Sequence, residues 1–359
     1  MGKFLINYKR KRNIAIALFL LIYFTNQFII SNWIFDLNKN YQNLTFIYFY
    51  ISAQVYYYYY YAIFKLGLMP KYDPTSLAHK VSLIKVGPIL SPATSSCADI
   101  DLVLVAFVVI APDRFEKRTK IRKTWANNSS NNMRVIFSTG MSKNSSVNKL
   151  IAKEALLYND ILQLDFIDSY YKIINKVLLT YKWLSSNCPN ARYILRINDD
   201  VVVNSFSLIK YLKNAHETRS AVFGNVMYFG LVVRDYKSKF YVPFEKTSKA
   251  FYDPYPEGTS YIITFDLARR FYDLGFDKLE PLTHTEDVFI GMMVKRDSVE
   301  LIDIGDKFPV RIQYEVYKKE QKIEMIDRMD INDALFVYEA DEFEFIWNHL
   351  LKKLKGSFQ

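Results

Sequence analysis

The sequence predicts an α/β fold, a mostly parallel sheet with flanking helices, preceded by one N-terminal transmembrane helix. Two observations indicate this fold class. After residue 100, short apolar runs alternate with longer amphipathic segments, which is typical of parallel strands joined by helical crossovers. Near the N-terminus, a basic tail precedes an uncharged stretch, residues 14–35, that is long enough to cross a bilayer. Half of the 359 residues are apolar, so the chain can also bury a sizeable core.

The N-terminal segments predict the membrane topology. Residues 1–13 carry basic and no acidic side chains, and such a tail stays cytoplasmic when the following segment, 14–35, inserts as a signal anchor. Everything after the anchor then lies in the lumen. A cleaved signal peptide is the alternative interpretation, but no small-x-small cleavage site follows the apolar stretch.

The distribution of charge excludes nucleic acid as a partner. The formal net charge is +10, and the tail alone supplies five positive charges through Lys3, Lys9, Arg10, Lys11 and Arg12. The remaining +5 (10 − 5) is spread over 346 residues (359 − 13), which is an ordinary protein surface.

Residues 36–99 are predicted to be a stem or linker that contains a tyrosine-rich tract, "YYYYYY" at 56–61. The uncharged stretch 44–64 could form a second span and return the rest of the chain to the cytoplasm. Four glycosylation patterns argue against that, at Asn43, Asn127, Asn128 and Asn144. Because tyrosine prefers interfaces to hydrocarbon, we expect 44–64 to be a membrane-hugging or packed stem.

Residues 100–359 are predicted to form the lumenal catalytic domain. Strands are expected at 101–110, 133–138, 161–166 and 193–197, and helices at 114–126, 147–158 and 170–185. Residues 341–355 should form a closing helix, because acidic side chains come first and lysines last, which matches the helix dipole.

The two cysteines, Cys97 and Cys188, each lie a few residues before a strongly apolar run. In a parallel sheet these runs start at the same edge, so neighbouring strands would bring the thiols within bridging reach in an oxidising lumen. Two buried free thiols are the alternative. Neither cysteine has a suitably spaced partner for a metal site.

The stretch "YILRINDDVVVN" places Asn198, Asp199 and Asp200 between two apolar runs. Adjacent carboxylates repel each other, so a bound cation would stabilise them, whereas a plain turn is the simpler interpretation. Ligands of such sheets bind outside the carboxyl ends of the strands, where this doublet falls. That position favours the metal interpretation.

Three arginines, Arg114, Arg118 and Arg122, recur every four residues along the first predicted helix of the domain. They share one helix face near the carboxyl end of the preceding strand and could bind an anion. A solvated basic face is the equally simple alternative, because lysines cover the rest of this helix.

Six motifs in the right order resemble the β-1,3-galactosyltransferase family, glycosyltransferase family 31. They are "RTKIRKTW" (118–125), "DFIDSYYKIINK" (165–176), "KW....C" (182–188), "RINDDVVVN" (196–204), "YPEGTSYIIT" (255–264) and "EDVFIG" (286–291). The resemblance implies a GT-A (Rossmann-like) fold in a single-pass type II protein of the Golgi membrane. It also implies an inverting hexosyltransferase, which moves a hexose (galactose or N-acetylhexosamine) from a UDP-sugar to a glycan hydroxyl on a glycoprotein or glycolipid, usually with manganese.

The resemblance also assigns roles. Asp200 corresponds to the principal metal ligand and Asp287 to the base that deprotonates the acceptor hydroxyl. Asn198 replaces the first aspartate of the family's Asp-Asp-Asp triplet, so weaker metal binding is expected. The residues expected to contact the donor are Arg118, Arg122, Lys176, Asn198, Asp199, Gly258 and Glu286.

Two alternative functions are also compatible with the sequence. Asn198 favours a non-catalytic relative that binds a glycan or a partner in the lumen. Independently, Thr283, Glu286 and Asp287 could simply cap a helix over residues 285–294. A metal-dependent hydrolase is the other alternative, but the sequence has no histidine-rich set for it.

Overall fold

The structure is a computed structural model, which describes residues 41–69, 83–93, 97, 102–127, 132–215, 220–307, 310–311, 336–338 and 343–356. The predicted tail 1–13 and anchor 14–35 lie outside the described residues. Among the residues that are described, no helix combines the length and the apolar character needed to span a bilayer.

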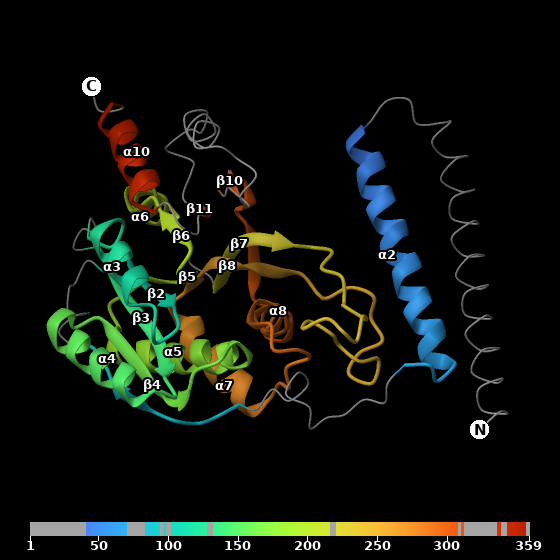
Figure 1. Ribbon diagram of the computed structural model, residues 1–359. Coiled ribbons are helices and arrows are strands. Elements are labelled where there is room, and N and C mark those ends of the chain that lie inside the picture. Colours follow the sequence, from blue (N-terminus) through green and yellow to red (C-terminus); the bar gives the residue numbers. More distant parts are fainter. Residues whose placement is uncertain are drawn as a thin grey trace. The chain divides into compact units, whose positions relative to one another are not determined.

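The helices and strands follow the predicted alternation closely (Figure 1). The helices are α2 (Tyr41–Lys65), α3 (Phe115–Lys123), α4 (Ser145–Tyr158), α5 (Ile173–Asn187), α6 (Ser205–Asn214), α7 (Asp266–Asp277), α8 (Glu286–Arg296) and α10 (Phe343–Gly356), with 3-10 turns η2 (Tyr170–Lys172) and η3 (Gly305–Lys307). The strands are β1 (Pro88–Leu90), β2 (Leu104–Val109), β3 (Met133–Met141), β4 (Ile161–Ile167), β5 (Tyr193–Asn198), β6 (Val201–Val203), β7 (Ala221–Met227), β8 (Tyr255–Thr264), β9 (Glu300–Asp303), β10 (Val310–Arg311) and β11 (Phe336–Tyr338).

The main sheet has the order β1-β4-β3-β2-β5-β8-β7-β9, and a small sheet has the order β10-β11-β6. Strands β4, β3, β2 and β5 are parallel, as predicted. The other half differs, because β8 runs antiparallel to both β5 and β7. The sheet is therefore mixed. The carboxyl end of β5 consequently lies beside the middle of β8, with Ile197 opposite Ser260.

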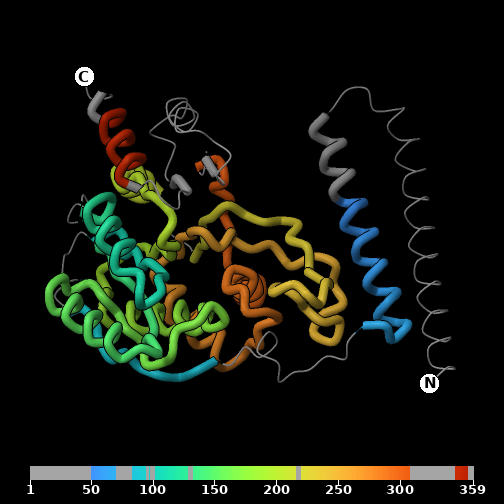
Figure 2. The backbone as a smooth tube through the Cα atoms, in the orientation of Figure 1, coloured from blue at the N-terminus to red at the C-terminus, as the bar shows by residue number. Residues whose placement is uncertain are grey.

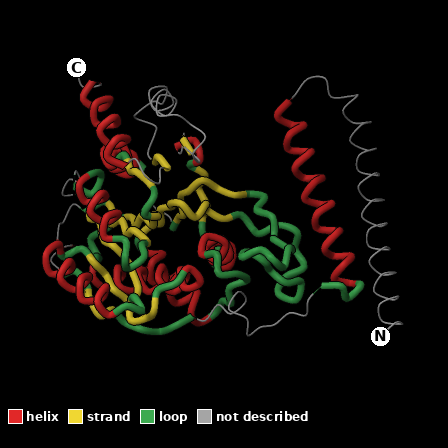
Figure 3. Tube along the Cα trace, viewed as in Figure 1, coloured by secondary structure: helices red, strands yellow, loops and turns green. Residues whose placement is uncertain are grey.

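Helices cover both faces of the main sheet (Figure 3). Alternate residues of β2 point to opposite faces, as the two-residue period of a strand requires. Leu104, Ala106 and Val108 pack in a cluster that includes residues of α3, α4, α6 and α10, whereas Val105 and Phe107 pack in a cluster that includes residues of α5, α7 and α8. Burial on both faces explains why the strand reads as a continuous apolar run.

The predicted bridge between Cys97 and Cys188 is confirmed. The two sulfur atoms are bonded, and the Cα atoms lie 4.9 Å apart. The geometric reason is the expected one, since β2 and β5 are parallel neighbours with Leu104 opposite Tyr193. Each cysteine precedes one of these strands at the same edge of the sheet.

The tyrosine tract belongs to α2, which forms one compact unit with the insertion 229–252 between β7 and β8 (Figure 2). The Tyr56 hydroxyl accepts hydrogen bonds from the backbone N–H groups of Arg234 (2.8 Å) and Asp235 (3.1 Å). The Tyr57 hydroxyl donates to the carbonyl of Ser248, at 2.8 Å. The tyrosine tract of stretch 44–64 thus packs against residues 229–252. Residues 83–228 and 253–356, where described, belong to the second unit.

Candidate active site

The acidic turn Asn198-Asp199-Asp200 follows β5 at the carboxyl edge of the parallel strands. The Asn198 amide oxygen accepts a hydrogen bond from Nη1 of Arg196, at 2.7 Å. An Asp199 carboxylate oxygen lies 4.0 Å from Nη1 of Arg114. One carboxylate oxygen of Asp200 is buried. The three side chains therefore face different surroundings, and Arg196 already engages the amide oxygen of the first.

Burial raises the pKa of Asp199, while Arg114 and Lys117 act in the opposite direction. These two cations stand at the start of α3, which follows the carboxyl end of β2. Arg114 is half-exposed. Of the three arginines in the predicted stripe, the structure thus brings Arg114 to the acidic turn. Arg114 is therefore a candidate for contact with the UDP-sugar, in addition to Arg118 and Arg122, which the motifs had indicated.

Arg118 and Arg122 are paired elsewhere. Arg118 is buried and forms an ion pair with Glu154 (2.7 Å), and it donates to two backbone carbonyls. Arg122 pairs with Glu154 (2.5 Å) and Asp160 (2.7 Å). An anion would have to displace these carboxylates to bind either guanidinium.

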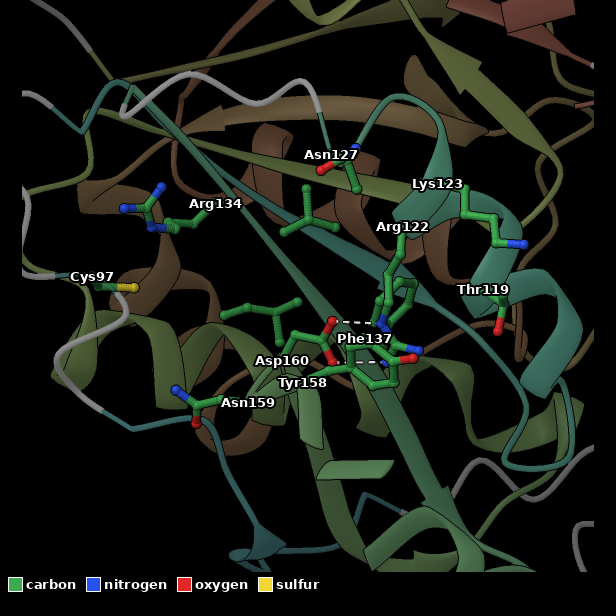
Figure 4. Close-up of a pocket in the computed structure, with 13 residues that line it drawn as sticks. Cys97, Thr119, Arg122, Lys123, Asn127, Arg134, Phe137, Tyr158, Asn159 and Asp160 are labelled. Carbon is green, nitrogen blue, oxygen red and sulfur yellow. Dashed lines mark hydrogen bonds and ion pairs between the residues drawn. The ribbon is translucent and has the colours of Figure 1, made fainter. Parts of the chain in front are cut away.

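Arg122 also lies at a separate cavity. Figure 4 shows its guanidinium bonded to Asp160 on the wall of a cavity of about 560 Å³, beside Tyr158 and the first residues of β3. The amino ends of β3 and β4 border this cavity, so it lies at the sheet edge opposite the acidic turn. The structure therefore brings Arg122 together with Arg118, through Glu154, but not with the predicted site residues at the acidic turn.

Lys176 is buried on α5, and its ammonium group joins the carboxyl ends of several strands. It donates to the carbonyl of Ile110 after β2 (3.0 Å) and pairs with Asp168 after β4 (2.7 Å). Asp168 in turn accepts from the backbone N–H of Gly140 in β3, at 2.8 Å. Burial lowers the pKa of Lys176, and Asp168 opposes that shift. Lys176 thus joins the carboxyl ends of β2 and β4, and β2 is the neighbour of β5, which leads into the acidic turn.

Glu286 and Asp287 occupy the first turn of α8. Glu286 points inward and is 4% exposed; its carboxylate pairs with Nη2 of Arg196 at 3.0 Å and accepts from the hydroxyl of Tyr261. Asp287 accepts the backbone N–H of Val288 at 2.8 Å, as a carboxylate at a helix N-terminus often does. Burial raises the pKa of both carboxyl groups. Only part of the capping alternative is therefore realised.

Gly258 lies directly against Asp287. A Cβ atom added at Gly258 would sit 2.7 Å from Oδ2 of Asp287, closer than real contacts allow. Glycine at this position therefore lets the backbone approach the carboxylate. Tyr261, on the same strand, is fully buried; its hydroxyl donates to Glu286 and accepts a hydrogen bond from the Tyr181 hydroxyl at 3.0 Å.

The residue that sequence reasoning missed is Arg196. It is 1% exposed in the central strand β5, and it bonds to Asn198, to the carbonyl of Gly258 and to Glu286. The available signal was an arginine inside the apolar run "YILRI", because an ionised side chain in a buried strand requires a partner. Through Arg196 the structure brings together Asn198, Gly258 and Glu286, which the sequence predicted separately.

The described residues contain no group of three or more His, Cys, Asp or Glu side chains that could hold a metal ion. Asn198 is engaged by Arg196, and Asp199 faces Arg114. Divalent cations bound to nucleotides commonly take one or two protein carboxylates and complete their shell with phosphates and water. Asp200, with one buried carboxylate oxygen at the acidic turn, is the residue that could serve as such a protein ligand, whereas the described residues do not form an all-protein metal cage.

A family model described as Galactosyltransferase matches residues 116–304. The chain belongs to this galactosyltransferase family. The match runs from α3 to just after β9, so it includes the acidic turn, Gly258 and the pair Glu286–Asp287. The family resemblance inferred from the six motifs is confirmed.

Curated relatives of this galactosyltransferase-family chain carry the names of β-1,3-glycosyltransferases. The lactosylceramide 1,3-N-acetyl-beta-D-glucosaminyltransferase of Rattus norvegicus is 32% identical over 238 residues, 63% of each chain. The beta-1,3-galactosyltransferase 1 of Mus musculus is 30% identical over 199 residues, 54% of this chain and 60% of the relative. The matched region thus spans less than two thirds of these relatives.

Among solved structures, a galactosyltransferase in complex with donor and acceptor sugar analogues aligns with 70% of this chain and 96% of its own. The sequence identity is 10% and the TM-score is 0.36, which is too low to establish a common fold.

Proposed function

We propose that this protein is an inverting hexosyltransferase with a GT-A fold. It would move galactose or an N-acetylhexosamine from a UDP-sugar to a hydroxyl group of an acceptor glycan on a glycoprotein or glycolipid, forming a β-1,3 linkage. Membership of the galactosyltransferase family supports this proposal, as do the activities named for its relatives.

The observation that carries the proposal is the position of Asp287. A buried carboxyl group with a raised pKa stands beside Glu286 and against Gly258, and Arg196 connects these residues to the acidic turn. A carboxylate whose pKa is raised toward neutrality suits general-base catalysis. Asp287 would take the proton of the acceptor hydroxyl as its oxygen attacks the anomeric carbon, and UDP would leave with the electrons of the broken bond.

The opposite end of the reaction needs positive charge on the leaving diphosphate. A divalent cation such as manganese, when bound, would neutralise this charge, and Asp200 would hold it. Arg114 and Lys117 add two cationic side chains near Asp199 from the start of α3. Helix N-termini also favour bound phosphate.

The first experiment is a UDP-release assay on purified protein with a panel of UDP-sugars, with and without glycan acceptors. Acceptor-dependent release supports transfer, and acceptor-independent release indicates a hydrolase. The absence of release with every donor, despite UDP binding, would favour a non-catalytic glycan-binding relative. Asp287→Asn should abolish transfer and keep UDP binding, whereas Asp165→Asn, at an exposed carboxylate on β4, should change neither.

We also propose the Golgi membrane as the location, with residues 1–13 cytoplasmic, 14–35 as the anchor and the catalytic part lumenal. The basic tail and the glycosylation patterns support this topology. In animal cells, endoglycosidase should then reduce the apparent mass, and the C-terminus should resist protease in sealed microsomes. A protease-sensitive C-terminus would overturn the topology.

A further inference from the structure

Arg196 places a permanent positive charge inside the central strand of the main sheet. It is 1% exposed, between β2 on one side and β8 on the other. Burying such a charge is costly, and a well-packed apolar side chain at the same place is often at least as stabilising. A role in stability therefore does not explain an arginine here.

The partners of Arg196 come from three separate parts of the chain. Nη1 donates to the amide oxygen of Asn198 (2.7 Å) and to the carbonyl of Gly258 (2.5 Å), and Nη2 pairs with Glu286 (3.0 Å). A guanidinium is planar, and its N–H groups point in fixed directions. One side chain consequently sets the end of β5, the β8 backbone and the first turn of α8 relative to one another.

Each partner lies next to a residue of the proposed reaction. Asn198 begins the acidic turn that contains Asp200. Gly258 touches the carboxylate of Asp287, and Glu286 precedes Asp287 in the same helical turn. The two halves of the site, donor and acceptor, are thus connected through one guanidinium.

We propose that Arg196 is a positioning residue for sugar transfer, which holds the base Asp287 in register with the acidic turn. The inference rests on the proposed function. The charge of Arg196 also acts on these carboxyl groups. Burial raises the pKa of both Glu286 and Asp287, and the nearby guanidinium lowers it, which favours their ionised forms. Among the described residues, Glu286, Tyr170 and Tyr255 are further titratable groups whose charges interact with that of Asp287.

The test uses two substitutions and a matched control in the full chain. Arg196→Lys keeps the positive charge but loses the planar set of N–H donors, and Arg196→Met removes both the charge and the donors. Tyr181→Phe is the control, because it removes a buried hydroxyl that donates to Tyr261 and not to Arg196 or Asp287, so every hydrogen bond of the Arg196 guanidinium is kept. Thermal unfolding gives the folded fraction, and kcat, KM and UDP binding are compared per folded molecule.

If Arg196 positions the base, Arg196→Met should lower kcat about 100-fold, the effect expected of a misplacement near 1 Å, and change UDP affinity much less. The acid limb of the pH profile of kcat should shift to higher pH in this variant, because the cation that favours the ionised form of Asp287 is missing. Arg196→Lys should recover the acid limb and only part of kcat. Tyr181→Phe should lower stability and leave kcat unchanged. Wild-type kcat and an unmoved acid limb in Arg196→Met would overturn the proposal.

Amide hydrogen exchange provides a readout that does not need activity. Arg196→Met should increase exchange in the segments around 256–259 and 286–289, which lie far from residue 196 in sequence. An increase confined to β5 would show that Arg196 supports only its own strand, and the positioning role would be rejected. If wild-type protein transfers no sugar, the proposed reaction fails, while the exchange result still decides whether Arg196 joins these segments.

Discussion

The contact between Gly258 and Asp287 allows the general-base assignment to be tested without altering a carboxylate. The substitution is Gly258→Ala. The new Cβ would lie 2.7 Å from Oδ2 of Asp287, whereas an ordinary contact begins at 3.4 Å, so the carboxylate must retreat by about 0.7 Å (3.4 − 2.7). Since a misplacement of about 1 Å can cost about 100-fold in rate, we expect kcat to fall roughly ten- to hundredfold.

The assay is UDP release at saturating donor and acceptor, together with a calorimetric titration of UDP. The affinity for UDP should stay near the wild-type value, because the base acts on the acceptor. Gly87→Ala is the matched control: no atom lies within 4 Å of the Cβ position at Gly87, and this substitution should change neither quantity.

A double substitution separates this mechanism from a general disturbance of β8. If the alanine acts through Asp287, combining it with Asp287→Asn should lower kcat no further than Asp287→Asn alone. Multiplicative losses, or a wild-type kcat in Gly258→Ala, would refute the reasoning that Asp287 must stand against Gly258.

Three further outcomes follow from the described contacts. Because burial raises the pKa of Asp287, its contribution to stability is present at low pH and is lost as pH rises through the folded-state pKa. Asp287→Asn should therefore gain melting temperature relative to wild type as pH increases, and a constant difference across pH would contradict this. Replacing both Cys97 and Cys188 by alanine removes a bridge that closes a loop of 91 residues, and chain entropy then predicts a loss of about 4 to 5 kcal/mol in the free energy of unfolding. Chemical denaturation measures this loss, and an unchanged midpoint and slope would contradict it. Asn198→Asp would place its new carboxylate where Nη1 of Arg196 already donates, so we expect little change in the manganese concentration for half-maximal rate, and a large decrease would show that position 198 faces the metal instead.

The parts of the fold that could be predicted from sequence are those governed by local pattern. The strand and helix alternation from β2 to β5 follows from hydrophobic periodicity, and the bridge between Cys97 and Cys188 follows once two runs are parallel neighbours. The reversal of β8 could not be predicted in this way, because β8 pairs with β5 only after a long excursion through β7 and the insertion 229–252.

For the site as well, some features could be predicted from local sequence pattern and others could not. Spacing placed Arg118 and Arg122 on one helix face, but it could not show that this face meets Glu154 and Asp160. The contacts of Arg196 are even harder to predict from sequence. Gly258 lies 62 positions after Arg196 in the chain, and Glu286 lies 90 positions after it (286 − 196). Only the three-dimensional pairing of β5, β8 and α8 makes these neighbours visible.

The docking of α2 onto the insertion 229–252 matters for anyone preparing a secreted form of this protein. A cut after Lys65 would remove the proposed anchor together with the tyrosine tract. The backbone N–H groups of Arg234 and Asp235 would lose their shared acceptor, and the ring of Phe244 would lose its contacts with Tyr57, Tyr61 and Phe64. Newly uncovered aromatic surface promotes aggregation. The favourable point of truncation therefore lies ahead of Tyr41, which keeps the helix with the loop it covers.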